Sequence, residues 1–367
     1  MILNFKLADK QVKNNGLIMK IFVTGGSGFI GTNFIYHSIS KCKNSILNYD
    51  KLTYAGNTDS LAELHKNKNY EFIHGDITDS QLLSSSMLSF SPDVIVHFAA
   101  ESHVDRSIDN PMDFINTNIL GTTILIQAAM KYWETSNNND FIFLHVSTDE
   151  VFGSLGKKGL FTENSNYKPN SPYSASKASS DHLVRSWHKT YGLPAIITNC
   201  SNNYGPYQFP EKLIPLIIAN CMDEKPLPIY GEGLNIRDWL FVEDHCRAIK
   251  LAIDAGGVGE TYNIGGDNEM SNIDIVKTIC MILDELKPRK NNISYEELIT
   301  FVEDRPGHDY RYAIDATKIS NDLGWSPKET FITGIKKTIQ WYLNNEVWWR
   351  KIQKQNYNQE RLGIKKQ

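Results

Sequence analysis

Short apolar runs alternate with longer amphipathic stretches along the first half of the chain. From residue 20 the runs KIFVTGG, SILNYD, YEFIHGD and DVIVHFAA are each followed by a longer segment, and FIFLHVST and AIITNC continue the series. Apolar runs of this length, separated by helices, are typical of parallel strands covered on both faces. The pattern predicts an α/β fold with a doubly wound parallel sheet of about seven strands.

The pattern changes after residue 203. Later segments such as PLPIYG, RDWLFVEDH, ETYNIGG and TFVEDRPGHD are shorter and are interleaved with helices. We interpret residues 19–203 as a Rossmann-type nucleotide-binding domain, to which some later segments return, and residues 204–350 mainly as a smaller C-terminal substrate-binding lobe. Residues 1–18 are expected to be an N-terminal extension or to reflect the choice of start site, and residues 351–367 a C-terminal tail.

Composition narrows the class of protein. The 367 residues are 41% hydrophobic and 22% charged, with a formal net charge of -4. Lys and Arg are dispersed, so no basic surface predicts nucleic-acid binding. No run reaches the roughly 18 apolar residues of a membrane span, and the first residues lack a signal-peptide core, so we expect no membrane association. Five cysteines without a CxxC pair favour a cytoplasmic protein with no metal site.

A glycine-rich turn follows the first predicted strand. Gly25, Gly28 and Gly31 permit a tight turn and let helix-terminal amides approach a pyrophosphate. Asp50 ends the second strand, about 20 residues beyond the last glycine, where a carboxylate binds the adenosine ribose and repels a 2′-phosphate. We therefore expect NAD rather than NADP, with Asp76 beside the adenine. A turn without a ligand and solvated turn aspartates are the alternatives.

Tyr173 and Lys177 are four residues apart in SPYSASK, so a helix places both on one face. An ammonium near a phenol stabilises the phenolate and lowers the tyrosine pKa from about 10. Tyr173 could then act as general base toward a sugar hydroxyl, and Lys177 could bind the nicotinamide ribose. An ordinary surface pair is the alternative, which the preceding glycine turn and the strand ending at Ser147 make less favourable.

Taken together, TGGSGFIG, the strand that ends at Ser147, and YSASK resemble the extended short-chain dehydrogenase/reductase superfamily. This resemblance implies reversible hydride transfer at a sugar carbon. It does not distinguish epimerases, dehydratases and decarboxylases, which share these parts.

Two adjacent carboxyl residues, Asp149 and Glu150, follow Thr148 at the end of the same strand. They lie where the carboxyl edge of the sheet would meet the reacting atoms. Elimination of water needs one acid and one base, and two carboxyl groups in different environments could divide these roles. An epimerase does not need them. A solvent-exposed turn pair is the alternative.

STDEVFG resembles the STDEVYG segment of the dTDP-glucose 4,6-dehydratase family. The similarity continues in DKLTYAGN, FAAESHVDRSI, SNNYGPYQFPEKLIP, IRDWLFVEDH and DRPGHDYRYAIDA, and covers nearly all of residues 19 to about 345. Phe152 replaces the usual tyrosine, and Thr198 stands where an arginine is common. These two departures leave fine specificity open, and residues 1–18 have no counterpart.

The family resemblance implies a role for each catalytic candidate. Tyr173 would take the proton of the 4-hydroxyl while Thr148 orients that oxygen and Lys177 supports the pair. Glu150 would remove the proton at carbon 5, and protonated Asp149 would donate to the departing 6-hydroxyl. NAD⁺ would take hydride from carbon 4 and return it to carbon 6, giving a 4-keto-6-deoxy sugar nucleotide.

The resemblance also implies the residues that contact each ligand. For NAD these are Gly25, Gly28, Phe29, Ile30, Gly31, Asp50, Lys51, Leu52, Thr53, Asp76, Ile77, Phe98, Ala99, Ala100, Ser102, Thr117, Ser147, Tyr173, Lys177 and Asn203. For the nucleotide-sugar substrate they are Ser102, Thr148, Asn202, Lys212, Leu213, Pro228, Ile229, Tyr230, Arg237, Asn272, Asp304, Arg305 and His308. Arginine suits the diphosphate because its planar fork matches phosphate oxygens. His103 and Asp105 are expected to form either a relay or a structural contact.

Other functions remain open at this point. They are a UDP-glucose 4,6-dehydratase, a UDP-sugar 4-epimerase and a non-catalytic NAD-binding sensor or scaffold. Asp149 and Glu150 argue against the epimerase, and a binding module has no need of both the acid pair and the redox pair. Spacing does not decide between thymine and uracil.

The family resemblance implies a homodimer in which the Tyr173 helix and the helix near residues 117–131 pair with their copies in the partner. Trp341, Trp348 and Trp349 predict that the C-terminal end docks either on its own chain or on a partner.

Overall fold

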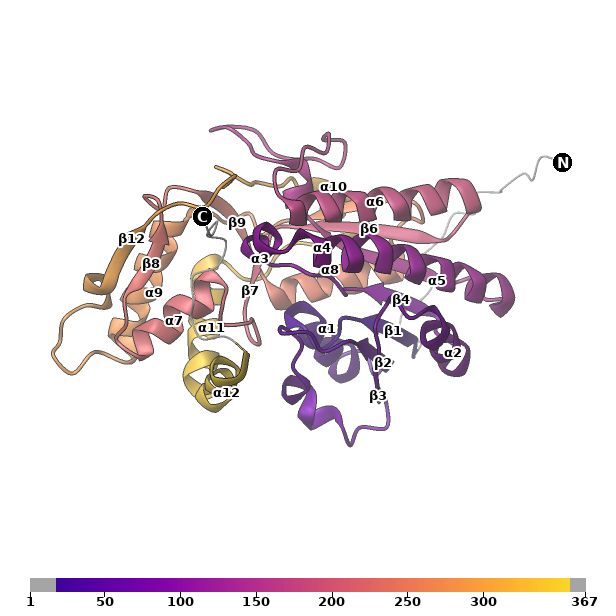
Figure 1. Cartoon of the computed structure of the whole chain (residues 1–367), viewed down its shortest axis with the longest axis horizontal. Helices are drawn as coiled ribbons and strands as arrows, with labels where there is room; N and C mark the ends of the chain where they lie inside the picture. Colours follow the sequence, from indigo (N-terminus) through magenta and orange to yellow (C-terminus); the bar gives the residue numbers. More distant parts are fainter. Residues whose placement is uncertain (1–17, 357–367) are drawn as a thin grey trace.

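The computed structural model describes residues 18–356, and a seven-stranded sheet lies at its centre (Figure 1). The strand order is β10-β6-β5-β4-β1-β2-β3, and all neighbours are parallel. The strands are β1 (Lys20–Thr24), β2 (Ser45–Asp50), β3 (Tyr70–His74), β4 (Val94–His97), β5 (Ile142–Thr148), β6 (Ala195–Cys200) and β10 (Thr261–Ile264). The predicted doubly wound α/β sheet is confirmed. Its direction of winding reverses between β1 and β4, where such sheets form a ligand crevice.

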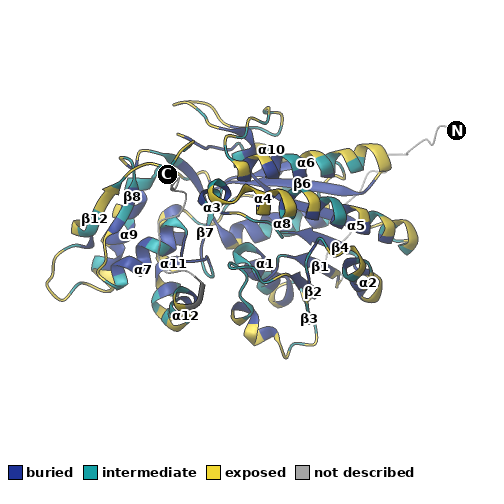
Figure 2. Cartoon of the chain, in the orientation of Figure 1, coloured by how far each residue is buried: buried dark blue, intermediate teal, exposed yellow. Residues whose placement is uncertain are grey.

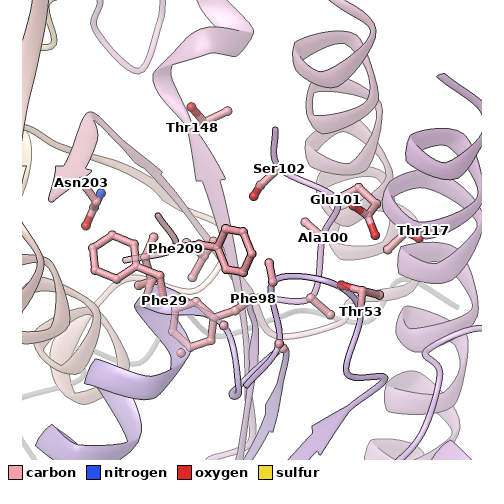
Figure 3. A pocket seen from close by; sticks show the side chains of 18 of the residues that line it. Phe29, Thr53, Phe98, Ala100, Glu101, Ser102, Thr117, Thr148, Asn203 and Phe209 are labelled. Atoms are coloured by element: carbon pink, nitrogen blue, oxygen red, sulfur yellow. The ribbon is translucent and has the colours of Figure 1, made fainter. Parts of the chain in front are cut away.

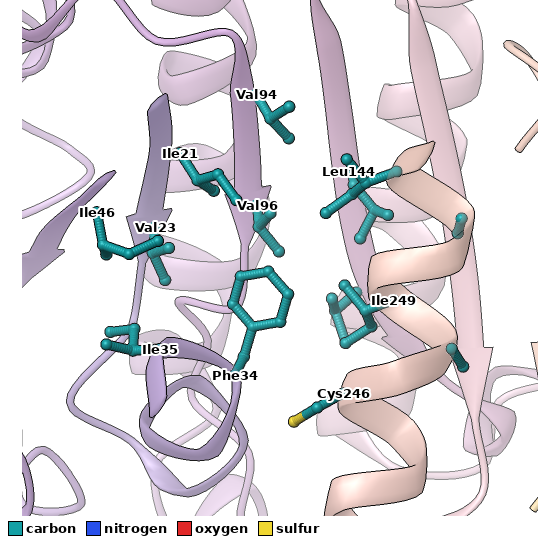
Figure 4. Packing of buried hydrophobic residues seen from close by; sticks show 14 of the residues in the cluster. Ile21, Val23, Phe34, Ile35, Ile46, Val94, Val96, Leu144, Cys246 and Ile249 are labelled. Carbon is teal, nitrogen blue, oxygen red and sulfur yellow. The ribbon is translucent and has the colours of Figure 1, made fainter. Parts of the chain in front are cut away.

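Helices cover both faces of this sheet. On one face lie α1 (Phe29–Ser40), α8 (Val242–Ala255) and α10 (Thr317–Leu323), and on the other α2 (Ser80–Phe90), α5 (Thr122–Ser136) and α6 (Pro172–Tyr191). Figure 4 shows Phe34 of α1 and Ile249 of α8 against the strand residues Val96 and Leu144. Because successive strand residues enter opposite layers, both faces must be apolar, which explains the unbroken hydrophobic runs.

A second lobe is built on two smaller sheets and has a core of its own (Figure 2). One sheet contains β7 (Asn202–Tyr204), β9 (Ile236–Phe241) and β11 (Glu269–Ser271), and the other β8 (Leu227–Tyr230) and β12 (Ile299–Val302). Its helices are α7 (Leu213–Met222), α9 (Asn272–Leu286), α11 (Phe331–Asn344) and α12 (Glu346–Asn356). The chain crosses between the lobes more than once, since α8, β10 and α10 pack with the large sheet although they follow β7 in sequence.

Short helices complete the fold. They are η1 (Thr58–Leu64), α3 (Val104–Asp109), α4 (Pro111–Phe114), η2 (Ile115–Gly121), η3 (Asp149–Phe152) and η4 (Tyr295–Leu298). Segments α4, η2 and α5 follow one another without a break.

Helix α6 carries clear start and stop signals. Ser171 and Ser174 form a reciprocal capping box, and Pro172 occupies the first turn, where its missing N–H costs nothing. Gly192 ends the helix with φ +79°, a conformation that favours glycine. These signals fix Tyr173 in the first turn of α6.

The C-terminal helix α12 docks on its own chain, which answers the question raised by the tryptophans. Trp349 is 0% exposed in the core of the second lobe, and its indole N–H donates to the Tyr342 carbonyl at 3.0 Å. Trp348 reaches the other lobe, where its indole N–H donates to Ser60 Oγ at 3.1 Å. Ile352 packs against Phe209. Helix α12 therefore ties the two lobes together.

Both ends of the chain extend past the described residues. Of the predicted extension 1–18, only Ile18 is described, and of the predicted tail 351–367, residues 351–356 continue α12 while 357–367 lie outside. Within residues 18–356, no helix combines the length and the apolar character needed to cross a membrane.

Replacing Trp349 with alanine should lower the free energy of unfolding by about 3–5 kcal/mol, because it removes buried surface and leaves a cavity. Chemical denaturation of the purified protein measures the change. Val347 lies in the same helix but is 85% exposed, so Val347→Ala should change the free energy of unfolding by less than about 0.5 kcal/mol. Equal effects for both variants would contradict the docking of α12.

Candidate active site

A pocket lies at the carboxyl edge of the large sheet (Figure 3). Its walls come from the turn between β1 and α1, the ends of β2, β4 and β5, helix α6 and the segment after β6. Of the residues predicted to contact NAD, all except Leu52 line this pocket. Thr148, Asp149, Glu150, Tyr173 and Lys177 line it as well. The sheet thus gathers both predicted sets in one place.

The glycine turn is closely packed. A Cβ on Gly25, whose φ is +72°, would lie 2.5 Å from the Ala99 nitrogen, and one on Gly31 would lie 2.4 Å from the Gly25 carbonyl oxygen. Helix α1 begins directly after Gly28, with no side chain capping its first turn. Its free N–H groups therefore face the pocket at the positive end of the helix dipole, which fits an anionic group.

Asp50 is held at the rim of the turn by backbone groups. Its carboxylate accepts hydrogen bonds from the amides of Ser27 and Leu52, both at 2.8 Å. Burial raises the pKa of this carboxyl, against the effect of the two hydrogen bonds. Leu52, which does not line the pocket, contacts Asp50 through its backbone amide. Asp76 forms an ion pair with Lys51 at 2.6 Å on the same side of the pocket.

The two candidate carboxyl groups, Asp149 and Glu150, occupy different environments. Thr148 ends β5, its Oγ1 accepts the Glu150 amide at 3.2 Å, and its hydroxyl donates to Asp149 Oδ1 at 3.3 Å. Burial, and then the charge of Glu150, raise the pKa of Asp149 well above its ordinary value. Burial also raises the pKa of Glu150, but Arg305 and Lys212 act against that shift. Asp149 is therefore the more readily protonated of the pair.

Tyr173 and Lys177 lie on consecutive turns of α6, as their spacing predicts. The Lys177 ammonium donates to the Val146 carbonyl at 2.8 Å. Burial raises the pKa of Tyr173 well above its ordinary value, and the charge of Glu150 adds to the rise. This direction is opposite to the lowering that we expected from Lys177, because desolvation and a nearby carboxylate dominate at the phenol.

A second pocket adjoins the first and shares six lining residues with it: Glu150, Asn202, Asn203, Gln208, Glu211 and Lys212. Of the residues predicted to contact the substrate, those that line it are Asn202, Lys212, Leu213, Pro228, Ile229, Tyr230, Arg237, Asn272, Arg305 and His308. Ser102 and Thr148 line the first pocket instead. Asp304 lines neither, since its carboxylate lies 2.6 Å from His308 Nδ1 and positions that ring.

The cations of the second pocket are held in place by their neighbours. Arg305 pairs with Asp105 at 2.8 Å, and the Tyr230 hydroxyl donates to the other Asp105 oxygen at 3.2 Å. The Arg237 guanidinium lies 4.3 Å from the centre of the Tyr312 ring and donates to the Asp309 carbonyl at 3.0 Å. Asp105 therefore contacts Arg305 and Tyr230, while its predicted partner His103 has its Nε2 atom 4.0 Å from Glu211.

Sequence reasoning missed several lining residues. In the first pocket they are Tyr49, Ala55, Gly56, Gly75, Glu101, Val146, Cys200, Ser201, Gln208, Phe209 and Glu211, and in the second Val104, Ile214, Leu216, Asn220, Trp239 and Val302. Glu101 and Glu211 directly precede predicted contact residues, so their position in the motifs was a usable signal. The apolar members carry no such signal, because their sequences read as ordinary core.

The two departures from the family pattern lie outside both pockets. Phe152 is buried, stacked on Phe161 at 5.1 Å between ring centres, with its edge toward Tyr167. Thr198 is buried inside β6. Neither residue lines the cavities in which ligands would lie. Among residues 18–356 there is also no cluster of three or more side chains suited to hold a metal ion.

Comparison with known proteins gives consistent matches along the whole chain. Residues 22–338 match the family model described as GDP-mannose 4,6 dehydratase. A dTDP-glucose 4,6-dehydratase of Escherichia coli is 58% identical over 360 residues, which covers 94% of this chain and 99% of the relative.

Solved structures separate the fold from the reaction. The dTDP-glucose 4,6-dehydratase of Bacillus anthracis, solved in complex with NAD, is 46% identical with a TM-score of 0.81, covering 91% of this chain and 99% of its own. The UDP-glucose 4-epimerase of Thermotoga maritima reaches a TM-score of 0.79 at 26% identity, covering 89% and 100%. The fold is thus shared by both enzymes, while the high identity is to the dehydratases. The chain belongs to the dTDP-glucose 4,6-dehydratase family.

Proposed function

We propose that this protein is an NAD-dependent dTDP-glucose 4,6-dehydratase, a hydro-lyase that forms dTDP-4-keto-6-deoxyglucose. The main support is that one pocket is lined by Thr148, Asp149, Glu150 and Tyr173. Its two carboxyl groups lie in different environments. Relatives of that name at 58% identity support the same reaction. A 4-epimerase would have no use for an acid and a base beside the redox pair.

The first pocket fits a dinucleotide. The uncapped amides of α1 suit its pyrophosphate, and the Asp50 carboxylate suits a ribose diol and opposes a 2′-phosphate. The end of β4, from Phe98 to Ala100, and Thr117 would enclose the rest. When bound, the cofactor would supply a hydride acceptor for carbon 4 in its oxidised form and a hydride donor for carbon 6 in its reduced form.

In the first step, Tyr173 would accept the proton of the 4-hydroxyl as carbon 4 is oxidised. Its pKa is raised by burial and by the charge of Glu150, so the phenolate needs positive charge nearby. Thr148 ends the neighbouring strand with a hydroxyl that can orient the same oxygen. Lys177 would hold the nicotinamide ribose and contribute its charge from the next turn of α6.

In the second step, the ketone at carbon 4 acidifies the proton at carbon 5, and water leaves across carbons 5 and 6. Glu150 would remove the proton, because Arg305 and Lys212 favour its ionised form. Asp149 would donate a proton to the departing 6-hydroxyl, because burial and Glu150 favour its neutral form. Two environments thus give two adjacent carboxyl groups opposite roles.

The substrate's nucleotide would occupy the second pocket. Lys212, Arg237 and Arg305 supply positive charge for a diphosphate, and arginine can bind two phosphate oxygens at once. Tyr230 offers a ring for stacking against the base. Glu150 borders both pockets, so a diphosphate in the second would direct its sugar to the catalytic residues in the first.

Purified protein should convert dTDP-glucose to a product lighter by one water, without added NAD or with catalytic amounts, because the redox cycle returns its hydride. Mass spectrometry and the alkaline absorbance of the 4-keto sugar measure the product. Conversion of UDP-glucose but not dTDP-glucose would support the same mechanism and show that the enzyme prefers uracil to thymine as the nucleobase. Formation of the galactose epimer without loss of water, or no turnover, would contradict the roles of Asp149 and Glu150.

Glu150→Gln should lower kcat by roughly 10²–10⁴-fold, because it removes the base for carbon 5 while leaving Tyr173 in place. Oxidation at carbon 4 should persist, so NADH absorbance should rise and stay high in a single turnover. Asp149→Asn should also lose turnover, because an amide cannot supply the proton. Glu297→Gln, an exposed control, should keep kcat within about twofold. Full turnover by Glu150→Gln would contradict its assignment as the base.

We also propose that the protein is a homodimer built on η2, α5 and α6. Met112, Ile115 and Leu120 of the α4–η2 segment are exposed apolar side chains, as is Tyr191 at the end of α6. Helices α5 and α6 pack beside each other (Figure 1), so a two-fold axis would bring four helices together. Such a contact would cover the exposed apolar residues.

Leu120→Arg should convert the dimer to a monomer, because it introduces an unpaired charge at the proposed interface. Analytical ultracentrifugation at micromolar concentration measures the mass. Met281, on α9 of the second lobe, is as exposed as Leu120, at 49% each, so Met281→Arg should leave the dimer intact. A monomeric parent protein, or a dimer that survives Leu120→Arg, would contradict the proposal.

The cytoplasm is the compartment that we propose for this protein. All five cysteines are free thiols, and Cys221 and Cys280 lie within hydrogen-bond reach of one another without forming a disulfide. Free cysteines are typical of a reducing compartment.

A further inference from the structure

A chain of buried polar side chains lies behind the catalytic helix. The imidazole of His145, on β5, has its Nε2 atom 3.5 Å from the Lys177 ammonium and 3.1 Å from Asp181 Oδ1. Lys177 and Asp181 are four residues apart on α6, so both lie on the face turned toward the sheet. All three side chains are buried. None of the steps proposed above uses Asp181.

The second oxygen of Asp181, Oδ2, is held by two hydrogen bonds. It accepts a hydrogen bond from the Tyr167 hydroxyl at 2.8 Å and from the Asn199 amide at 3.2 Å. The same Asn199 amide donates to the Thr148 carbonyl at 3.1 Å. Asp181 is therefore tied on one side to the catalytic lysine, through His145, and on the other to the strand end that carries Thr148.

We propose that Asp181 is a positioning residue for the oxidation at carbon 4, acting as the buried counter-charge that keeps Lys177 an ammonium and holds it beside the pocket. The inference rests on the proposed function, since it assigns Lys177 to the redox step. Asp181 does not line either pocket, so it would act through Lys177 and not on the substrate.

The need for a counter-charge follows from burial. An ammonium taken out of water is costly unless a carboxylate is close, and without one the group loses its proton instead. Burial lowers the pKa of Lys177, and Asp181 acts against that shift. Burial alone would raise the pKa of Asp181, but His145 and Lys177 hold it below its ordinary value. Each charge therefore favours the other.

The surrounding groups leave this pairing intact. Burial lowers the pKa of His145 to about 4, so its ring is neutral near pH 7 and does not cancel the carboxylate. The titratable groups facing the cluster are Tyr173 of α6, His97 of β4, Cys200 of β6 and Tyr167 of the segment before α6. The Arg185 guanidinium lies 5.7 Å from the centre of the Tyr167 ring. Burial lowers the pKa of His97 and raises those of Tyr167 and Cys200, so these three are neutral as well.

The alternative is that Asp181 only ties Tyr167 and Asn199 to α6. A structural tie predicts a loss of stability and an activity loss of the same size at every pH. A counter-charge predicts a change in pH dependence, because removing it lowers the pKa of Lys177. The ammonium is required in the redox step. As the pH is raised, a variant without the Asp181 charge should therefore lose activity at a lower pH than the parent protein does.

The test uses the holoenzyme and dTDP-6-deoxyglucose, a probe that can be oxidised at carbon 4 but has no 6-hydroxyl to eliminate. Formation of NADH then reports the redox step alone, without Asp149 and Glu150. In Asp181→Asn, the loss of rate at high pH should begin about one pH unit lower than in the parent protein. At a pH where both rates are falling, the variant should be roughly tenfold slower than the parent. On the acid side the rate should stay within about threefold of the parent.

Two matched variants separate charge from contact. Asp181→Glu keeps the negative charge, so its dependence of rate on pH should match that of the parent protein. Tyr167→Phe removes one hydrogen bond to Asp181 but keeps the carboxylate, so its dependence of rate on pH should also be unchanged. If Asp181→Asn does not fold, Asp181→Ser, which leaves room for water, provides the same comparison. An unshifted profile in a folded, charge-neutral variant would overturn the inference. Turnover of dTDP-glucose by the parent tests the proposed function separately.

Discussion

The first pocket depends on the parallel register of the central strands, whose carboxyl ends lie at one edge of the sheet. Thr24 of β1 pairs with His97 of β4, and His97 pairs with His145 of β5, so these strands reach the same edge together. Ser147 and Asn199 continue the register to β6. Because side chains that follow parallel strands must meet at that edge, the glycine turn and the Thr148–Glu150 segment come together although more than 100 residues separate them in sequence.

Charge burial is the second constraint, and it follows from the first. Gathering titratable residues at one edge under a second lobe removes them from water, so their proton affinities are set by their neighbours more than by residue type. Asp149 and Glu150 are adjacent in sequence, yet at Glu150 the charges of Arg305 and Lys212 act against burial, whereas at Asp149 the charge of Glu150 adds to it. The same physics raises the pKa of Tyr173 and ties Lys177 to Asp181.

The second lobe supplies both the cations and the closure of the site. Arg237 and Arg305 of this lobe line the second pocket. Each contacts a residue that is distant in sequence, Asp309 for Arg237 and Asp105 for Arg305. Helix α12 reinforces this arrangement, because Trp349 anchors it in the lobe core while Trp348 bonds to Ser60 beside the first pocket. The geometry between the two pockets is therefore fixed at more than one point.

The sequence by itself determined what depends on local spacing. The alternating apolar runs established the doubly wound sheet, Gly25 and Asp50 located the dinucleotide turn, and the four-residue spacing of Tyr173 and Lys177 put both on one helical face. The sheet and the helical pair follow from backbone periodicity, and the turn follows from the spacing of a short motif, both of which a single sequence displays directly.

Only the tertiary structure decided the rest. It turned Asp304 toward His308 and Leu52 toward Asp50, brought Asp181 and His145 behind the lysine, and raised the pKa of Tyr173 where spacing had predicted a fall. Desolvation and long-range contacts depend on which elements cover a residue. No local pattern contains that information, because the covering elements lie far away in the chain.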